Sequence, residues 1–448
     1  MNKALKHFRR GAMLGSLSLL VSGCAFFKAD KIHYTWNPDT IPQCSDCNTD
    51  AHSAGEDAQK TTVFVGLALS GGGARASVFG AAAIEALERA NLMDRVHYIS
   101  SVSGGGFAAS YYALKKPKIC DDGALSCAEN SFAVFKQTMR QNYLSQMTKR
   151  QLTKPGRITS PTRRLSSLQE VLDREFIDGA DFSDLPSSPI LLINGARYDD
   201  GRRFVFSTKA IPEGDSGIAP FTEEALRTAS FSLPGCPHAT PDDFSLALAI
   251  AISAGFPPLL GPAAIEAPSE CASEQMQFWH LGDGGILDNS GVESLEDFAL
   301  RAEPNRPQTI VIFAMDAGRS TSADVMMNTR NLKLWTSDPG RVVDIVGKRA
   351  NAYRDVVLNN AYKNSGVEFH FLDMRYTDAQ IKEWPPSCGA RENDAAAISA
   401  HLAAIPTNFK ITDCDADLME LAAHDLVERA LADHRDELIR AGLFHHEK

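Results

Sequence analysis

The chain has 448 residues, of which 44% are hydrophobic and 23% are charged. This composition excludes a disordered chain, a collagen-like repeat and a coiled coil, and the length suggests two or three domains or one large α/β domain with additions. The formal net charge of −11 leaves no basic excess to displace phosphate counterions, so we do not expect nucleic acid as a partner.

Residues 1–23 predict a secretion signal that ends at a lipid attachment site. A basic start is followed by an apolar run from Gly11 to Gly23, which is shorter than the roughly 20 residues that span a bilayer. The run continues into Cys24 as Val-Ser-Gly-Cys, which resembles the bacterial lipoprotein signal. The resemblance implies cleavage before Cys24 and lipid on its thiol. Because Ala25 follows, we expect the outer membrane, at its periplasmic face; ordinary secretion with an incidental cysteine is the alternative.

The other eight cysteines form an even number, which fits an oxidising compartment. Pairing of sequence neighbours is the simplest arrangement and gives 44–47, 120–127, 236–271 and 388–414. The Cys44–Cys47 spacing also occurs in redox and metal sites. It lies in a polar stretch without a strand–helix context or a second ligand pair, so we expect a structural disulfide there.

The next segments predict a polar tether followed by repeated strand–turn–helix units. Residues 24–60 have no periodic apolar face, which is typical of a tether. A strand is predicted over 63–69, a helix over 76–90, a strand over 95–101 and a helix after the glycines at 104–106. Two strand–glycine turn–helix units in succession indicate a parallel α/β sheet.

The rest of the chain predicts further strands and a helical end. We expect mostly helix over 128–180, a strand pair over 189–196 and 204–207, a helix over 246–254, and strands over 278–281 and 309–314. Beyond residue 320, we expect helices over 341–362, 393–404 and 415–440 and a strand over 367–372. The chain is thus predicted to have a catalytic core over 61–320 and a mainly helical part, 321–448, packed on it.

A first glycine-rich turn, Gly71–Gly73, follows a predicted strand and opens a helix. Ligands of parallel sheets bind beyond the carboxyl ends of strands, and free amides at a helix start favour an anion. The turn also fits the dinucleotide pattern G-x-G-x-x-A. That pattern requires an acidic residue at the end of the next strand, where this chain has Ser100 and Ser101, so we discard this interpretation.

The second turn surrounds Ser103 and resembles the nucleophile elbow G-x-S-x-G, with Ser101 in place of the first glycine. Such an elbow presents a hydroxyl beside amides that can stabilise an oxyanion. The alternative is that Ser103 simply caps the following helix. The two interpretations stay open on this motif alone.

The third turn, Asp283 followed by two glycines, offers a general base. A carboxylate there could accept the serine proton if apolar surroundings raised its pKa, although an aspartate that only forms a turn is the alternative. His97 is a poor candidate for the base, because it precedes Ser103 by six residues of extended strand, which is roughly 20 Å. We expect His280 to be a structural strand residue.

The three turns, in this order and spacing, resemble the patatin-like phospholipases over about residues 62–318. Segments 192–206, 251–262 and 283–295 share the resemblance. It implies an α/β fold, a three-layer α/β/α sandwich with a mostly parallel central sheet, and a Ser–Asp dyad without a catalytic histidine. Ser103 is then the nucleophile and Asp283 the base.

The same resemblance implies an oxyanion hole formed by Gly71, Gly72 and Gly73, with Arg75 helping to fix it. Ala76 and Ser101 stand where the family usually has glycine. The implied activity is hydrolysis of acyl-ester lipids, of the phospholipase A or lysophospholipase type, on membrane phospholipid or another acyl-ester lipid, without a cofactor or metal. An acyltransferase, or a membrane-tethered lipid-binding or interaction protein on an inactive scaffold, are the alternatives.

Overall fold

A computed structural model describes most of the chain outside the N-terminal region. The described residues are 31–32, 34–36, 63–120, 130–154, 156–211, 227–231, 240–257, 259–267, 277–300, 306–318, 349, 352 and 366–444. Within these ranges, no helix is long and apolar enough to cross a membrane.

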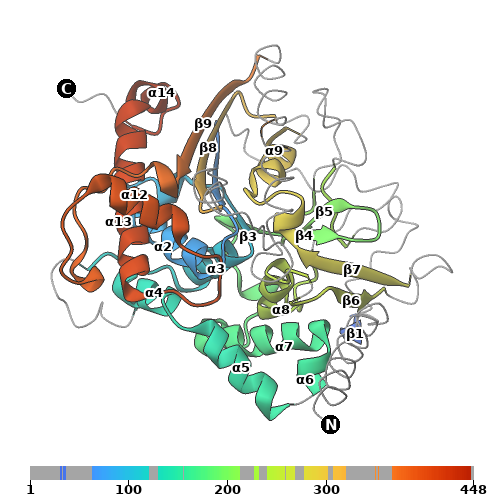
Figure 1. Cartoon of the computed structure of the whole chain (residues 1–448). Helices are drawn as coiled ribbons and strands as arrows, with labels where there is room; N and C mark the ends of the chain where they lie inside the picture. The colour runs from blue at the N-terminus through green and yellow to red at the C-terminus, as the bar shows by residue number, and fades with distance from the viewer. Residues whose placement is uncertain are drawn as a thin grey trace, which may run out of the picture.

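One mixed, mostly parallel sheet forms the centre of the molecule (Figure 1). Its order is β1-β6-β7-β4-β3-β2-β8-β9, and β5 pairs with β4. Strands β2, β3, β4, β8 and β9 are parallel, whereas β7 runs antiparallel to both neighbours. The strand bounds are β1 Lys31–Ile32, β2 Val63–Leu69, β3 Tyr98–Val102, β4 Ile190–Arg197, β5 Arg202–Phe206, β6 Ala263–Glu266, β7 Phe278–Asp283, β8 Thr309–Asp316 and β9 Glu368–Arg375.

Helices cover both faces of this sheet, as the apolar strands require. On β2, Val65, Leu67 and Leu69 enter the larger core, while the alternate residues Phe64 and Ala68 face the smaller one. A strand that is apolar on both sides must be covered on both sides, which is the reason parallel sheets have two helical layers. The predicted α/β architecture is therefore confirmed.

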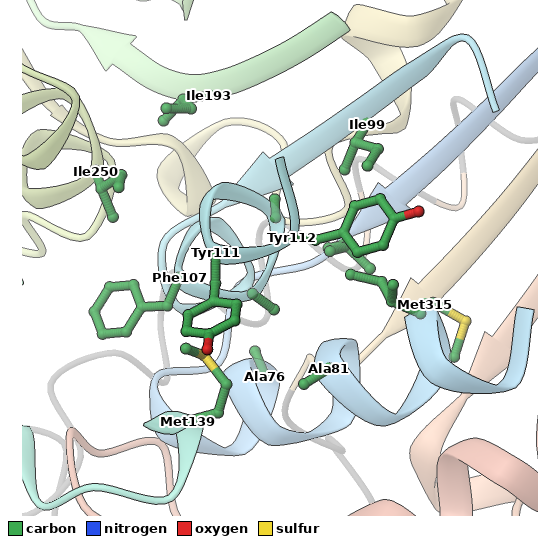
Figure 2. Close-up of a cluster of buried hydrophobic side chains, with 14 of the residues drawn as sticks. Ala76, Ala81, Ile99, Phe107, Tyr111, Tyr112, Met139, Ile193, Ile250 and Met315 are labelled. Atoms are coloured by element: carbon green, nitrogen blue, oxygen red, sulfur yellow. The ribbon is translucent and has the colours of Figure 1, made fainter. Parts of the chain in front are cut away.

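Helices α2, α3 and α8 lie over the larger core, and α9 packs over the smaller one. Figure 2 shows part of the larger core, where Phe107 and Tyr111 of α3, Ile250 of α8 and Ala76 of α2 meet beside Ile193 of β4. The helix bounds are α2 Ala74–Arg89, α3 Gly104–Lys115, α4 Phe132–Met139, α5 Tyr143–Thr153, α6 Gly156–Thr159, α7 Pro161–Leu172, α8 Leu246–Ser253, α9 Val292–Leu300, α12 Ala395–Ala404, α13 Asp413–Asp433 and α14 Arg435–Arg440.

Most predicted elements occur within a few residues of their predicted bounds. The single helix predicted over 415–440 is divided at His434 into α13 and α14. Two strands were not predicted, β6 and the two-residue β1. The helix predicted over 341–362 lies almost entirely outside the described residues.

Part of the predicted tether belongs to the folded body. Residues 31–32 pair in parallel with β6, and the Trp36 indole N–H donates to the Glu266 carbonyl at 2.7 Å. Trp36 also packs edge-on against Phe231 and obliquely against Trp279. The tether prediction over 24–60 is therefore wrong for residues 31–32 and 34–36, because the aromatic side chains of Tyr34 and Trp36 pack on the folded body. Its other residues lie outside the described ranges.

The C-terminal part is built into the fold as well as packed on it. Strand β9 extends the sheet beside β8, and α13 packs along α2. Cys388 and Cys414 form a disulfide, as predicted, which closes the loop before α13. Cys120 is also disulfide-bonded, and its predicted partner Cys127 lies outside the described residues.

Candidate active site

Ser103 occupies a sharp turn between β3 and α3. Its φ of 51° and ψ of −120° lie in a region that non-glycine residues rarely adopt, and such backbone costs about 1–3 kcal/mol. The turn presses against the Gly71–Gly73 segment, since a Cβ at Gly104 would lie 2.0 Å from the Gly73 carbonyl oxygen. Glycine after Ser103 is therefore a steric requirement of this close approach.

Two buried residues hold the Ser103 backbone in place. The Ser103 N–H donates to Ser253 Oγ at 2.9 Å, and the Ser253 hydroxyl donates to the Asn194 carbonyl at 2.6 Å. The Asn194 side chain in turn donates to Ser100 Oγ and to the Ser101 carbonyl at 2.8 and 2.9 Å. Every polar group of this network is paired, which makes it a rigid support for a strained turn.

The register of three strands brings Asp283 to Ser103. Val102, which precedes Ser103, pairs with Asn194 of β4, and the next β4 residue, Gly195, pairs with Asp283 of β7. Ser103 and Asp283 are therefore at the same level of the sheet on either side of β4. The Ser103 hydroxyl lies close enough to the Asp283 carboxylate for a side-chain hydrogen bond to act on the pKa of that carboxylate. The structure thus brings together the two residues that the sequence predicted as a dyad.

Burial gives the Asp283 carboxylate an unusual acidity. Only 5% of the residue is exposed, and this loss of solvent raises its pKa from 3.8 to about 7. Hydrogen bonds from the Gly285 N–H, at 2.7 Å, and from Ser103 act in the opposite direction but do not offset the burial. A carboxylate with a pKa near 7 can both accept and return a proton at neutral pH.

The glycine turn after β2 offers two amides rather than three. The Gly71 N–H donates to the Asn289 carbonyl at 2.9 Å, so it is already occupied. Among the described residues, the N–H groups of Gly72 and Gly73 meet no acceptor. We therefore correct the predicted set of oxyanion donors: Gly71 is held by Asn289 and shapes the turn, while Gly72 and Gly73 keep free donors.

Arg75 fixes this turn to the C-terminal part. Its buried guanidinium donates to the carbonyls of Ala317, at 2.7 Å from Nη2, and of Ile405, and to the Thr407 hydroxyl at 3.1 Å. It also lies 5.0 Å from the centre of the Tyr376 ring. Arg75 therefore ties the start of α2, directly after the glycine turn, to Ala317 and to the C-terminal part.

The C-terminal segment also contacts the glycine turn directly. The Ala74 N–H donates to the Asn408 carbonyl at 2.7 Å, and a Cβ at Gly73 would lie 2.3 Å from that oxygen. We call residues 405–409 the C-terminal brace. The brace and Arg75 together give the C-terminal part a structural role at the site that the sequence did not predict.

The two departures from the family pattern fit their surroundings. Ser101 is fully buried, and its hydroxyl donates to the Leu192 carbonyl at 3.3 Å. Ala76 is buried in the larger core (Figure 2). Both positions accommodate a small side chain without displacing the elbow or the glycine turn.

Neither candidate histidine belongs to the dyad. His97 Nδ1 accepts a hydrogen bond from the Val65 N–H at 3.0 Å, and burial lowers its pKa. His280 Nδ1 pairs with the Asp199 carboxylate at 2.7 Å on the half-exposed side of β7. Both histidines have structural contacts, as expected.

Sequence reasoning missed Asn194, Ser253 and Asn289. Asn289 lies within reach of two turns: its side-chain oxygen would be 2.3 Å from a Cβ at Gly71 and 2.7 Å from one at Gly285. All three residues fall inside segments that carry the family resemblance. Their roles depend on contacts between distant strands, which a single sequence does not reveal.

One grouping of possible metal ligands occurs among the described residues, formed by His401, Cys414 and Asp415. The Cys414 sulfur is bonded to Cys388, and His401 Nε2 is paired with Asp415 at 2.7 Å. The grouping stabilises the start of α13 and offers no open ligand set.

We expect Arg75→Lys to lower kcat by about tenfold, equivalent to about 1.4 kcal/mol of transition-state stabilisation, with little change in KM. A lysine cannot reach all the acceptors that the buried guanidinium joins, so the Gly72 and Gly73 amides lose their fixed direction. Steady-state kinetics on a soluble ester check this. Arg89→Lys is the matched control, because Arg89 ends the same helix and pairs with Glu85 near the surface. Equal effects of the two substitutions would contradict a positioning role.

We expect Ser253→Ala to leave the Ser103 N–H without its acceptor and to lower kcat by roughly tenfold, since a buried unpaired donor costs about 1–3 kcal/mol. Ser245→Ala is the matched control. Ser245 caps the other end of α8, and its loss costs about 1 kcal/mol of stability. Thermal unfolding and kinetics of both variants separate the effects: only Ser253→Ala is expected to change kcat beyond what its stability loss explains.

Residues 67–296 match the family described as patatin-like phospholipase, which is half of the chain. The chain belongs to the patatin-like phospholipase family. Membership supports a lipid acyl hydrolase in general terms. No curated protein matches the chain.

Three solved structures are similar to the chain at low identity. Human GIVD cytosolic phospholipase A2 has 12% identity and a TM-score of 0.48, over 85% of this chain and 63% of that one. Its complex with methyl gamma-linolenyl fluorophosphonate has 12% identity and a TM-score of 0.45, over 85% and 59%. VipD from Legionella pneumophila has 12% identity and a TM-score of 0.32, over 84% and 67%. The chain thus spans about three fifths of the length of the human chains.

Proposed function

We propose that this protein is a serine acyl hydrolase of the phospholipase A or lysophospholipase type, with Ser103 as nucleophile and Asp283 as general base. The observation that carries the proposal is the approach of the Ser103 hydroxyl to the buried Asp283 carboxylate, which the register of β3, β4 and β7 places at the same level of the sheet. A serine becomes nucleophilic when an adjacent base accepts its proton, and here a buried carboxylate lies beside the hydroxyl.

The first half of the reaction forms an acyl-enzyme. Ser103 Oγ attacks the ester carbonyl carbon while its proton passes to Asp283. The tetrahedral intermediate then collapses, and Asp283 returns the proton to the departing alcohol. A pKa of about 7 suits both transfers, because the carboxyl group is neither too weak a base nor too weak an acid near neutral pH.

The charge that develops on the carbonyl oxygen requires fixed donors. The free amides of Gly72 and Gly73, beside the start of α3, supply them in this proposal. One oxyanion donor is worth about 2.7–4 kcal/mol in enzymes where it has been removed. Arg75 and the C-terminal brace act by keeping these amides in place.

The second half of the reaction releases the fatty acid. Asp283 takes a proton from a water molecule, the resulting hydroxide attacks the acyl-Ser103 carbonyl, and Asp283 returns the proton to Ser103. The same two amides stabilise this second intermediate. The cycle leaves the enzyme unchanged and consumes one water for each ester bond.

Covalent labelling tests whether Ser103 is reactive. We expect a fluorophosphonate probe to add to Ser103, with the adduct found on the peptide that contains it by mass spectrometry. Incubation with phosphatidylcholine is then expected to release fatty acid and lysophospholipid. An unlabelled protein that still binds lipid would support the inactive-scaffold alternative instead.

An added alcohol distinguishes a hydrolase from an acyltransferase. For a hydrolase, increasing concentrations of a long-chain alcohol are expected to leave free fatty acid as the main product. Predominant formation of a new acyl ester would show that the acyl-enzyme is transferred to the alcohol, and would change the reaction class while keeping the dyad.

We also propose that Cys24 carries a lipid that holds the protein at the periplasmic face of the outer membrane. The support is the sequence pattern before Cys24, which lies outside the described residues. Metabolic labelling with palmitate is expected to mark the wild-type chain and to miss Cys24→Ser. Equal labelling of both chains would contradict the anchor.

A further inference from the structure

The three most exposed apolar side chains among the described residues come from neighbouring segments, because α5 packs on α6, α6 on α7 and α7 on α8. Six large hydrophobic residues are exposed, and three exceed half exposure: Leu152 at 67%, Leu259 at 57% and Ile158 at 51%. Leu152 is on α5, Ile158 is on α6, and Leu259 is in the turn after α8. Single exposed apolar residues are ordinary on a protein surface. A group of the three most exposed ones indicates a surface that binds another molecule.

Hydrogen bonds join the turn that bears Leu259 to the start of α7. The Gly261 N–H donates to the Pro161 carbonyl at 3.2 Å, and the Thr162 hydroxyl donates to the Pro262 carbonyl at 2.7 Å. The turn that bears Leu259 is thereby fixed to the start of α7, directly after α6. Figure 1 shows α5, α6 and α7 grouped below α8. We call this surface the α5–α7 corner.

The corner is basic although the whole chain is acidic. Residues 147–164 contain no aspartate or glutamate, while the chain has a net charge of −11. The basic residues of this segment are Lys149, Arg150, Lys154, Arg157, Arg163 and Arg164. Glu170 pairs with three of them, Arg150, Lys154 and Arg157. Lys149, Arg150, Lys154 and Arg157 alone provide four positive charges, against the one carboxylate of Glu170 that pairs with three of them. A positive excess therefore remains beside the exposed apolar side chains.

Exposed leucine and isoleucine among lysine and arginine match the chemistry of an anionic lipid surface. Apolar side chains enter the boundary between headgroups and acyl chains, while cations contact the phosphates. We propose that the α5–α7 corner is the surface by which this protein rests on an anionic phospholipid bilayer. This proposal concerns binding and is independent of whether Ser103 is catalytic.

The corner is joined to the Ser103 turn by a short path. Leu259 follows Ser253 by six residues, and Ser253 Oγ accepts the Ser103 N–H. Six residues span at most about 22 Å, so Leu259 and Ser253 are no farther apart than that. Docking at the corner therefore places the Ser103 turn near the bilayer. A protein held there meets lipid without leaving the membrane surface.

Amide hydrogen exchange of the full-length protein tests the location of the surface. The protein is measured alone, with phosphatidylcholine vesicles, and with vesicles containing phosphatidylglycerol. We expect slower exchange over residues 149–160 only with the anionic vesicles. Bound protein that shows unchanged exchange over these residues would overturn the proposal, because another segment would then be the contact.

Substitutions test the chemistry of the surface in vesicle sedimentation. The Lys149→Gln/Lys154→Gln variant is expected to bind anionic vesicles about fivefold more weakly for each charge removed. Leu152→Ser/Ile158→Ser is expected to bind them at least tenfold more weakly. Leu421→Ser is the matched control, since Leu421 is 43% exposed on α13. The N-terminal segment is common to all variants, so its contribution cancels in the comparison.

The remaining outcomes also decide the proposal. Equal binding by wild type and both corner variants would overturn it, as would equal losses for the Leu421 control. A change of oligomeric state in the Leu152→Ser/Ile158→Ser variant without vesicles would assign the corner to a second copy of the chain. Hydrolysis of a short soluble ester is expected to stay unchanged in the corner variants. If the wild type does not hydrolyse esters at all, the comparison of vesicle binding still tests the surface, because binding is measured directly.

Discussion

Ser103→Ala is expected to lower the hydrolysis of acyl esters by about 10⁴-fold or more, because removal of a nucleophile abolishes the covalent route. Binding of the substrate is expected to change little, since the hydroxyl is small and its partner is a single carboxylate. Burst kinetics with a chromogenic short-chain ester measure the loss, and the absence of an initial burst would show that the acyl-enzyme no longer forms.

Ser110→Ala is the matched control for this experiment. Ser110 lies on the same helix, α3, and is fully buried. Its hydroxyl has no hydrogen-bond partner in the described part of the chain. The same chemical change at this position is expected to leave kcat within about twofold, because removing this hydroxyl breaks no hydrogen bond and opens no large cavity. Residual activity of Ser103→Ala similar to that of Ser110→Ala would remove Ser103 from the mechanism.

The activity is expected to depend on pH through Asp283. The base acts only as the carboxylate, and its pKa is about 7. The value of kcat/KM on an uncharged ester is therefore expected to fall about tenfold for each pH unit below that pKa and to reach a plateau above it. A flat profile between about pH 5 and pH 8 would contradict Asp283 as the base.

Asp283→Asn is expected to abolish this profile and to lower kcat by about 10⁴-fold, since an amide cannot accept the proton. The same change is expected to stabilise the fold. The folded-state pKa is raised above the unfolded value of 3.8, so the folded protein binds the proton more tightly than the unfolded chain does. The stability cost of ionising Asp283 is absent below the unfolded pKa, grows as the pH rises, and is complete above the folded pKa.

Denaturation measures this second effect. The full cost corresponds to about 4 kcal/mol at 1.36 kcal/mol for each pKa unit, so Asp283→Asn is expected to gain up to this amount near pH 8 and almost nothing near pH 4. Asp288→Asn is the control, because Asp288 caps α9 through the Ser290 and Glu293 amides and is expected to lose stability. A destabilised Asp283→Asn variant at pH 8 would show that burial of this carboxylate carries no cost.

The elements near the first two turns could be predicted because their determinants are local. The apolar run 63–69, the glycines that follow it and the periodic apolar residues of α2 together specify strand, turn and helix. The same holds for Ser103, whose strained conformation depends on the glycines next to it. The pairing of Cys388 with Cys414 was also predicted, since short loops are the simplest to close.

Asp283 was predicted at the site, but the physical reason was incomplete. The argument assumed strands whose carboxyl ends share one edge of a parallel sheet. Strand β7 is antiparallel to β4, so this argument does not apply to it. What brings Asp283 to Ser103 is the register of β7 on β4 opposite Gly195. Register between strands more than 80 residues apart depends on tertiary packing, which the sequence pattern alone does not specify.

The C-terminal brace could not be predicted for a similar reason. Residues 405–409 have no regular pattern, and their role lies in main-chain groups, such as the Ile405 and Asn408 carbonyls. Main-chain contacts carry no side-chain signature in a sequence. Residues 31–32 and 34–36 differ in this respect, because the side chains of Tyr34 and Trp36 anchor them although the segment as a whole is polar.

The bond between Arg75 and Ile405 spans 330 positions of the chain, and this has a consequence during biosynthesis. Ser103 and Asp283, the two residues of the proposed dyad, leave the ribosome before residues 405–409, which hold the glycine turn. Closing such a long connection is among the slow steps of assembly. A polypeptide that ends before Ile405 therefore lacks this support of the glycine turn, and under the proposed mechanism it is expected to cleave esters more slowly than the full chain.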